Sequence, residues 1–594
     1  MSKTPELTDR LIRQKSAPEL FSKGQFYYES GNVTAVTRRG NLLNAEVIGD
    51  AVQPYRVRIR LDEGGVTSAT CSCAYDDDNQ WCEHIVATLF VVMRQPETIQ
   101  ERPSLEQLLD LLNRVQIQGL VQNLVKQNPE LLDEIDCYIT LNIGPKIDPF
   151  RAKSQRPSPI NSAPFRQQAR DIIYEGMRYF ENLDGEDDPV TEELLDLIDN
   201  VQGLIEIGQT YNALIVLEAI ASACAADWDR VEQYGIDSYE IIIALDEAIA
   251  EAILSDSLSA SEVEEWRSRL ETLQDEWSTE FALSLESLTQ GWDDPDLVAA
   301  LKGTRTKPEI EEESLANYSP DLVLIRLRIL DRQERYQEYL NLAQAKGKMK
   351  QYLTMLGSLG RTAEAMAAAQ TQMKTMEEAL SLGQTLRSNG EVSKALEVGG
   401  MGLKLPGNCQ YELASWTADL AEGLGNTEVE LEARQSAFYN NPTSLNYIRI
   451  KELTGENWSK IQPNLLKSLR QHTSWGTIEV KVDIFLSEGL IDEAIACVTD
   501  LSYYHSDLLH RVMEAAIPNR PDWVIENARP RAESILDRKK SESYNQAINW
   551  LKKVRAAYIQ KDQWQGWKTY RQELLQTHAR KHKFRGMLED RRLD

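Results

Sequence analysis

The chain has 594 residues, of which 42% are hydrophobic and 27% are charged, with 31 Gly and 21 Pro. This balance excludes a collagen-like, low-complexity or mainly disordered chain, and the length allows about four domains or one long repeat array. Residues 1–15 lack the apolar core of a signal peptide, and the longest apolar run, 85–93, falls far short of the ~20 residues of a membrane span. We therefore expect a globular cytoplasmic protein that does not enter a membrane.

The acidity of the chain is concentrated in one region. The formal net charge is −28, yet residues 181–313 alone hold 35 acidic and 6 basic residues. The rest of the chain is thus close to neutral, and the overall charge does not predict its partners. Two interpretations stay open for the acidic region: the solvated faces of amphipathic helices, or a surface that repels nucleic acid and holds a basic partner or a basic patch of the same chain.

After an N-terminal extension, 1–20, three segments rich in β-branched and aromatic residues predict a small antiparallel sheet: 25–36, 41–48 and 55–61. In the third segment apolar residues alternate with arginines, which predicts one buried face and one row of positive charge. The arginines are Arg56, Arg58 and Arg60. They are candidate ligand-binding residues for nucleic acid. The alternative is a solvated sheet face on which they pair with Asp62 or Glu46.

The cysteines give the strongest motif in the sequence. Residues 71–84 read CSCAYDDDNQWCEH, that is C-x-C, eight residues, then C-x-H. Three thiolates and one imidazole complete the tetrahedron that zinc prefers and leave no position for water, which is typical of a structural site. Cys71 and Cys73 would lie where a strand ends, and Cys82 and His84 at the start of the next helix. A redox pair or coincidence is the other interpretation; the isolated Cys137, Cys224, Cys409 and Cys497 are interpreted as small buried hydrophobic residues.

The motif, the preceding strands and the apolar helix after His84 together resemble a SWIM zinc finger, over roughly Phe21 to Met93. The resemblance implies that Cys71, Cys73, Cys82 and His84 bind one structural Zn²⁺. It also implies DNA binding or protein–protein interaction, and SWIM modules occur in bacterial proteins linked to SWI2/SNF2-type ATPases. Many SWIM modules carry Lys where this chain has Glu83, and residues 76–78 are all Asp. This acidic tip favours a protein partner over phosphate.

Two helices are expected at 105–126 and 129–140, within a helical pair at 104–143 that also resembles larger bacterial SWIM proteins. Residues 144–165 contain five prolines and predict a linker. The linker is basic, with Lys146, Arg151, Lys153 and Arg156. It could contact DNA or the acidic region, or it could be an ordinary solvated linker.

From residue 166 onward the hydrophobic period is that of helices. A short motif recurs at Gly208, Gly360, Gly390, Gly425 and Gly489, with Ala five residues later in all copies but one, where Glu430 stands. It predicts helical hairpins in which Gly ends one helix and Ala allows close packing of the next. The spacing resembles an irregular tetratricopeptide (TPR)-like array, whose concave surface commonly holds a protein.

The C-terminal stretch 564–592 interleaves aromatic and basic residues, so it is a second candidate for nucleic-acid binding. The candidate ligand-binding residues are Arg580, Lys581, Lys583 and Arg585. In the alternative interpretation, Trp564 and Trp567 pack on the preceding helix and the basic residues complement a helix end.

The predicted fold is mainly α: a SWIM zinc module at 21–95, the helical pair, the linker, an acidic helical region at 166–313, and a TPR-like α-solenoid with a basic C-terminal helix at 314–594. No nucleotide-binding loop, HExxH motif or nucleophile elbow is present. We therefore expect a non-enzymatic adaptor without a small-molecule substrate, which docks a protein such as a SWI2/SNF2-type ATPase. The second hypothesis is a DNA- or RNA-binding protein that uses the arginine row, the linker and the C-terminal helix, regulated by its acidic middle.

Overall fold

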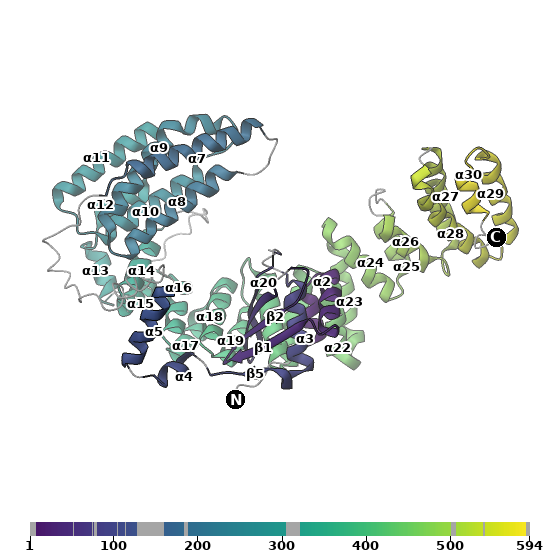
Figure 1. Cartoon of the computed structure of the whole chain (residues 1–594), viewed down its shortest axis with the longest axis horizontal. Helices are drawn as coiled ribbons and strands as arrows, with labels where there is room; N and C mark the ends of the chain where they lie inside the picture. The colour runs from purple at the N-terminus through teal and green to yellow at the C-terminus, as the bar shows by residue number, and fades with distance from the viewer. Residues whose placement is uncertain are drawn as a thin grey trace. The chain divides into compact units, whose positions relative to one another are not determined.

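A computed structural model of the chain describes residues 7–51, 53–73, 75, 80–103, 105–112, 114–127, 160–182, 188–304, 321–499, 506–538 and 541–589 (Figure 1). The chain forms two compact units. One comprises residues 1–100, 375–377 and 399–594, and the other 101–374 and 378–398. The predicted helix at 129–140, most of the predicted linker and the predicted start of the solenoid at 314 lie outside the described residues.

The first unit begins with a small α+β module. Its elements are α1 (Asp9–Gln14), α2 (Pro18–Glu29), β1 (Val33–Arg39), β2 (Leu42–Val47), β3 (Tyr55–Asp62), β4 (Gly65–Cys71), α3 (Glu83–Arg94), η1 (Pro96–Thr98) and the two-residue strand β5 (Gln100–Glu101). The sheet order is β4-β3-β2-β1-β5, and neighbouring strands from β1 to β4 pair antiparallel. The core lies between the sheet and helices α2 and α3, where Phe21, Ile59 and Phe90 are buried.

One predicted strand is partly wrong. Residues 25–29 belong to α2, and β1 begins only at Val33. The aromatic residues Phe26, Tyr27 and Tyr28 favour a strand by propensity. Packing overrides this preference because Phe21, Gly24 and Tyr27 recur every three residues and are buried as one helical face. Gly24 allows the close approach to α3, since a Cβ there would lie 2.5 Å from Val86 Cγ1.

Helices make up most of the remaining described residues of both units, as predicted, but the helix expected at 105–126 is divided into two. Up to α13 they are α4 (Leu105–Asp110), α5 (Arg114–Gln127), α7 (Ala163–Asn182), α8 (Pro189–Glu206), α9 (Thr210–Glu232), α10 (Tyr239–Ser255), α11 (Ala260–Trp277), α12 (Ala282–Gln290) and α13 (Pro295–Leu301). Figure 1 shows α7, α8, α9 and α10 running side by side, and their buried faces form one core. Because α7 begins at Ala163, the last residues of the predicted linker are helical.

The later helices are shorter and mostly paired. They are α14 (Leu322–Arg332), α15 (Tyr336–Ala345), α16 (Met349–Ser358), α17 (Thr362–Gln372), α18 (Met376–Ser388), α19 (Val392–Gly402), α20 (Gln410–Gly423), α21 (Thr427–Asn440), α22 (Ser444–Thr454), α23 (Trp458–Gln471), α24 (Ile478–Ser487), α25 (Ile491–Val498), α26 (Ser506–Ala516), α27 (Pro521–Asp537), α28 (Tyr544–Gln560), α29 (Trp564–Thr577) and α30 (His582–Leu588). Short 3₁₀ turns are η2 (Gly455–Asn457), η3 (Trp475–Thr477) and η5 (Ser541–Ser543).

The recurring glycines end helices as predicted. All five have positive φ, between 69° and 84°. At each one the next residue's N–H donates to the carbonyl five residues back, for example Arg361 to Leu356 and Asn426 to Ala421. This is the closure that a left-handed glycine allows. The Ala five residues after the glycine is fully buried at positions 213, 365, 395 and 494.

Three turns of this kind among the described residues carry no glycine. Ser278, between α11 and α12, has φ of 53°, whereas Glu334, between α14 and α15, and Asp562, between α28 and α29, have φ of 56°. In each turn the next residue closes the same hydrogen bond. The glycine motif could not reveal these copies. Among the described residues, no helix has both the length and the apolar content to cross a membrane.

Candidate metal centre

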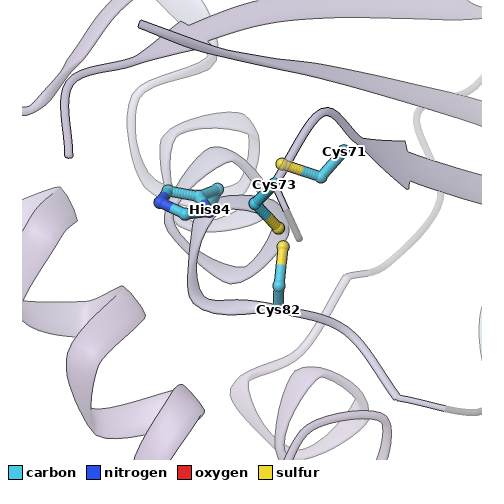
Figure 2. A group of neighbouring side chains, drawn as sticks. All are labelled: Cys71, Cys73, Cys82 and His84. Atoms are coloured by element: carbon cyan, nitrogen blue, oxygen red, sulfur yellow. The ribbon is translucent and has the colours of Figure 1, made fainter. Parts of the chain in front are cut away.

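The four residues of the cysteine motif converge at the junction of the sheet and α3. Strand β4 ends at Cys71, with Cys73 two residues beyond, and Cys82 is the N-cap of α3 with His84 in its first turn. Their ligand atoms all lie within 4.8 Å of one another. In Figure 2 the three cysteine side chains turn toward one another, and the ring of His84 lies beside them. The predicted origin of the ligands, a strand end and a helix start, is confirmed.

The size and chemistry of the cluster fit a tetrahedral metal ion. With Zn–S bonds of ~2.3 Å, the ligand atoms of a tetrahedron lie about 3.8 Å apart. A small contraction of the cluster would therefore close it around an ion. Cys82 and His84 are buried and Cys71 and Cys73 are half-buried, so the protein itself supplies four donors in a site partly shielded from solvent.

The imidazole of His84 is an unsatisfied group without an ion. His84 is 3% exposed, and both of its ring nitrogens are buried with no hydrogen-bond partner among the described residues. Buried polar atoms of this kind are costly unless they are paired. A metal bound to one ring nitrogen would remove much of that cost.

The pKa values of the three thiols also favour a bound cation. A hydrogen bond from Cys71 lowers the pKa of the Cys82 thiol to about 4, and the same contact raises the pKa of Cys71. Burial raises the pKa of Cys73. One thiolate is therefore formed readily, whereas three together require a positive charge between them, which a divalent ion supplies.

Comparison with known families settles the nature of this segment. Residues 55–92 match the family model of the SWIM zinc finger. The chain contains a SWIM zinc finger. The match covers β3, β4 and most of α3 with all four ligands, and it is shorter than the predicted resemblance, which began near Phe21.

Three residues outside the ligand set surround the ring of His84. The ring of Tyr55 lies 4.0 Å from the ring of His84, and the ring of Tyr27 lies 5.6 Å from it, centroid to centroid. Gly49 packs closely against the rings of Tyr55 and His84, since a Cβ there would lie 2.7 Å from Tyr55 and 3.1 Å from His84 Nε2. The sequence motif did not reveal these residues, because none of them is a metal ligand.

Glu83, which departs from the usual lysine of SWIM modules, does not add to an acidic tip. It is 8% exposed, and Lys23 Nζ on α2 donates to it at 2.7 Å. Burial alone would raise the pKa of Glu83, but the hydrogen bond from Lys23 and other contacts hold it below the ordinary value. Glu83 is therefore a paired, buried carboxylate and not part of an exposed acidic tip. The aspartates at 76–78 lie outside the described residues.

The arginine row of the SWIM finger lies on the sheet face opposite the core. Arg56, Arg58 and Arg60 are exposed, whereas Val57, Ile59 and Leu61 between them are buried. No ion pair to these arginines is found in the described part of the chain, although Glu46 is the cross-strand neighbour of Arg56. A hollow of about 350 Å³ is lined by Leu42, Asn44, Arg58, Arg60, Ser68 and Thr70.

The C-terminal basic residues have mixed surroundings. Lys581 donates to the carbonyl of Leu536 at the end of α27, and Arg585 pairs with Glu589 at 3.2 Å. Arg580 and Lys583 are exposed. The aromatic residues of this stretch belong to a core, since Trp567 is fully buried with Trp550 and Leu551. Lys581 and Arg585 thus make contacts at the ends of helices. Nucleic-acid binding by the four basic residues remains a prediction.

Proposed function

We propose that the protein is a non-enzymatic adaptor. Its SWIM finger binds one structural Zn²⁺ through Cys71, Cys73, Cys82 and His84 and recognises another protein, and its TPR-like helical hairpins dock a larger partner. For that partner we propose an ATPase of the SWI2/SNF2 type, because the resemblance to bacterial SWIM proteins implies this association. We propose a cytoplasmic location, where a reducing environment keeps the three thiols available for metal.

The donor set carries this proposal. Four protein ligands saturate a tetrahedral zinc ion and leave no position for water or substrate, so the site favours holding structure together over catalysis. Bound zinc would fix the end of β4 against the start of α3. The hairpins add a second argument, because helix pairs that stack on their neighbours offer long surfaces to proteins.

Affinity purification of the full-length protein from its native cell tests this function. We expect the same protein partner with and without nuclease treatment, and loss of partners that contact the SWIM finger after Cys71→Ser with Cys82→Ser. Recovery of nucleic acid alone, or steady turnover of a substrate by the purified protein, would contradict the adaptor proposal.

One observation favours nucleic acid as a second candidate ligand. The hollow beside Arg58 and Arg60 combines two exposed guanidinium groups with the hydroxyls of Ser68 and Thr70 and the amide of Asn44, all groups that donate to phosphate oxygens. Contacts with several phosphates would make binding steeply weaker between ~50 and 200 mM salt.

Paired substitutions separate the two basic surfaces. If the sheet face binds, Arg58→Gln with Arg60→Gln should abolish the salt-sensitive binding of a labelled oligonucleotide. Arg580→Gln with Lys583→Gln removes the same charge from the C-terminal stretch and should leave that binding intact. Negligible binding of the unmodified protein at ~50 mM salt would remove this candidate.

A further inference from the structure

Within the first unit, the module that carries the SWIM finger contacts helices α20, α21 and α22. Arg10 of α1 pairs with Glu422 of α20, and at 2.9 Å with Glu452 of α22. Lys15, which follows α1, lies 3.4 Å from Asp419. The side chain of Gln14 accepts from Arg434 of α21 at 3.4 Å. One short helix therefore contacts three helices that lie about 400 residues further along the chain.

The helical side of this contact is an ionic cluster in which Glu422, Glu430 and Arg434 are buried. Arg434 is 1% exposed and donates to Asp419 at 3.0 Å and to Glu422 at 2.8 Å, while Glu430 pairs with Arg449. The four carboxylates of the cluster are Asp419, Glu422, Glu430 and Glu452, and its own cations are Arg434 and Arg449. Two negative charges are thus left for Arg10 and Lys15. Glu422 is buried beneath α1, whereas Asp419 is half-buried and Glu452 is exposed. The excess negative charge of this surface therefore favours a basic partner.

A second contact joins the sheet to the same helices. Gly64, in the turn between β3 and β4, lies against Gly423 at the end of α20, and a Cβ at Gly423 would overlap the carbonyl oxygen of Gly64. Glycine within a helix is unfavourable by roughly 0.5–1 kcal/mol relative to alanine. The close approach to the module gives a reason for glycine at this position.

Each of these two contacts is connected through a short segment of the module to a metal ligand. Strand β4 starts next to Gly64 and ends at Cys71. The backbone N–H of Trp81, adjacent to Cys82, donates to the carbonyl of Lys15 at 2.6 Å. An ion that joins Cys71 to Cys82 therefore fixes the relative position of the two parts of the module that contact α20–α22.

We propose that α20–α22 form the docking site for the chain's own SWIM module, and that docking depends on the metal. With metal bound, the module covers this acidic surface. Without metal, the strand end and the Trp81 segment are no longer held together, so the module leaves and the surface is open to a basic segment of another protein. This proposal rests on the metal binding proposed above.

Hydrogen exchange of the full-length protein, measured by mass spectrometry with and without a zinc chelator, tests the metal dependence. We expect metal removal to speed exchange in residues 9–14 and 410–454 by roughly tenfold or more, with little change in α27 and α28 of the same unit. Faster exchange confined to residues around the ligands would overturn the coupling. The metal content of each sample is measured alongside, and a protein that holds no zinc would also overturn it.

Variants of α1 test the docking surface independently of the metal. Arg10→Ala with Lys15→Ala should expose 410–454 to exchange while zinc content stays at the unmodified level. Arg13→Ala is the matched control, because Arg13 stacks on Phe21 inside the module, 4.0 Å from its ring centre. Unchanged protection of 410–454 in the double variant would overturn the docking proposal and leave the adaptor function standing.

Discussion

At the scale of single residues, the site depends on neighbours that bind no metal. His84 has no hydrogen-bond partner for either ring nitrogen among the described residues, and it is positioned by ring contacts from Tyr55 and Tyr27 and by the absence of a side chain at Gly49. Groups that orient a ligand in this way commonly change metal affinity when they are altered.

Gly49→Ala should therefore weaken zinc binding by about tenfold or more, because its methyl group would push Tyr55 and His84 out of position. Competition with a chromogenic chelator measures the effect. Gly203→Ala is the control, since a Cβ at Gly203 meets open space. Equal zinc affinity in Gly49→Ala and the unmodified protein would show that Gly49 does not position the ligand.

Glu422 predicts a dependence of stability on pH. Burial alone would raise the pKa of Glu422, but the charges of Arg10 and Arg434 outweigh it and the pKa is lowered. A carboxyl whose pKa is lower in the folded than in the unfolded protein stabilises the fold above the unfolded value of ~4.3, and this contribution is lost as the pH falls through the folded pKa.

We expect Glu422→Gln to unfold at a lower temperature than the unmodified protein at pH 7, with the difference shrinking below about pH 4.3. Thermal unfolding followed across this range checks the prediction. Comparing the two proteins at each pH removes the effect of the other carboxyls. A difference that stays constant with pH would show that the ionised form of Glu422 has no special role.

At the scale of elements, the helical hairpins depend on residues that adopt left-handed backbone angles. Gly390, between α18 and α19, has φ of 84° and space around its Cα. The conformational cost of a side chain there is therefore separable from any clash.

Gly390→Ala should destabilise its hairpin by about 1–2 kcal/mol, and Gly390→Asn by less, because asparagine tolerates the left-handed region better than alanine. Chemical denaturation of both variants, with hydrogen exchange in 376–402 to locate the change, makes the comparison. If alanine and asparagine were equally costly, the backbone angle would not explain the glycine.

The metal ligands and most of the helical hairpins could be predicted from the sequence, because the patterns that mark them are local. The ligands Cys71 to His84 lie within one short segment, and the glycine motif marks five of the turns directly. Aromatic propensity predicts a strand at 25–29, but these residues are helical because Tyr27 is buried on the same helical face as Phe21 and Gly24. The turns at Ser278, Glu334 and Asp562 were not predicted, because their left-handed residues are not glycine.

At the scale of the whole molecule, the contact between the SWIM module and α20–α22 was not predictable from local patterns. Arg10 and Glu422 are separated by 412 residues. One signal was present in the sequence: Glu430 stands where other hairpins carry a buried Ala, and it is 1% exposed. A charged residue at such a position requires a partner, which Arg449 and its neighbours supply.

We propose that Cys71, Cys73, Cys82 and His84 hold one zinc ion that supports the fold of the SWIM module. Native mass spectrometry of the reduced full-length protein, purified in the presence of zinc, tests it most directly. We expect one zinc ion per chain, and none after Cys71→Ser with Cys82→Ser. An unmodified protein without zinc, or a double variant that still holds one ion, would contradict it.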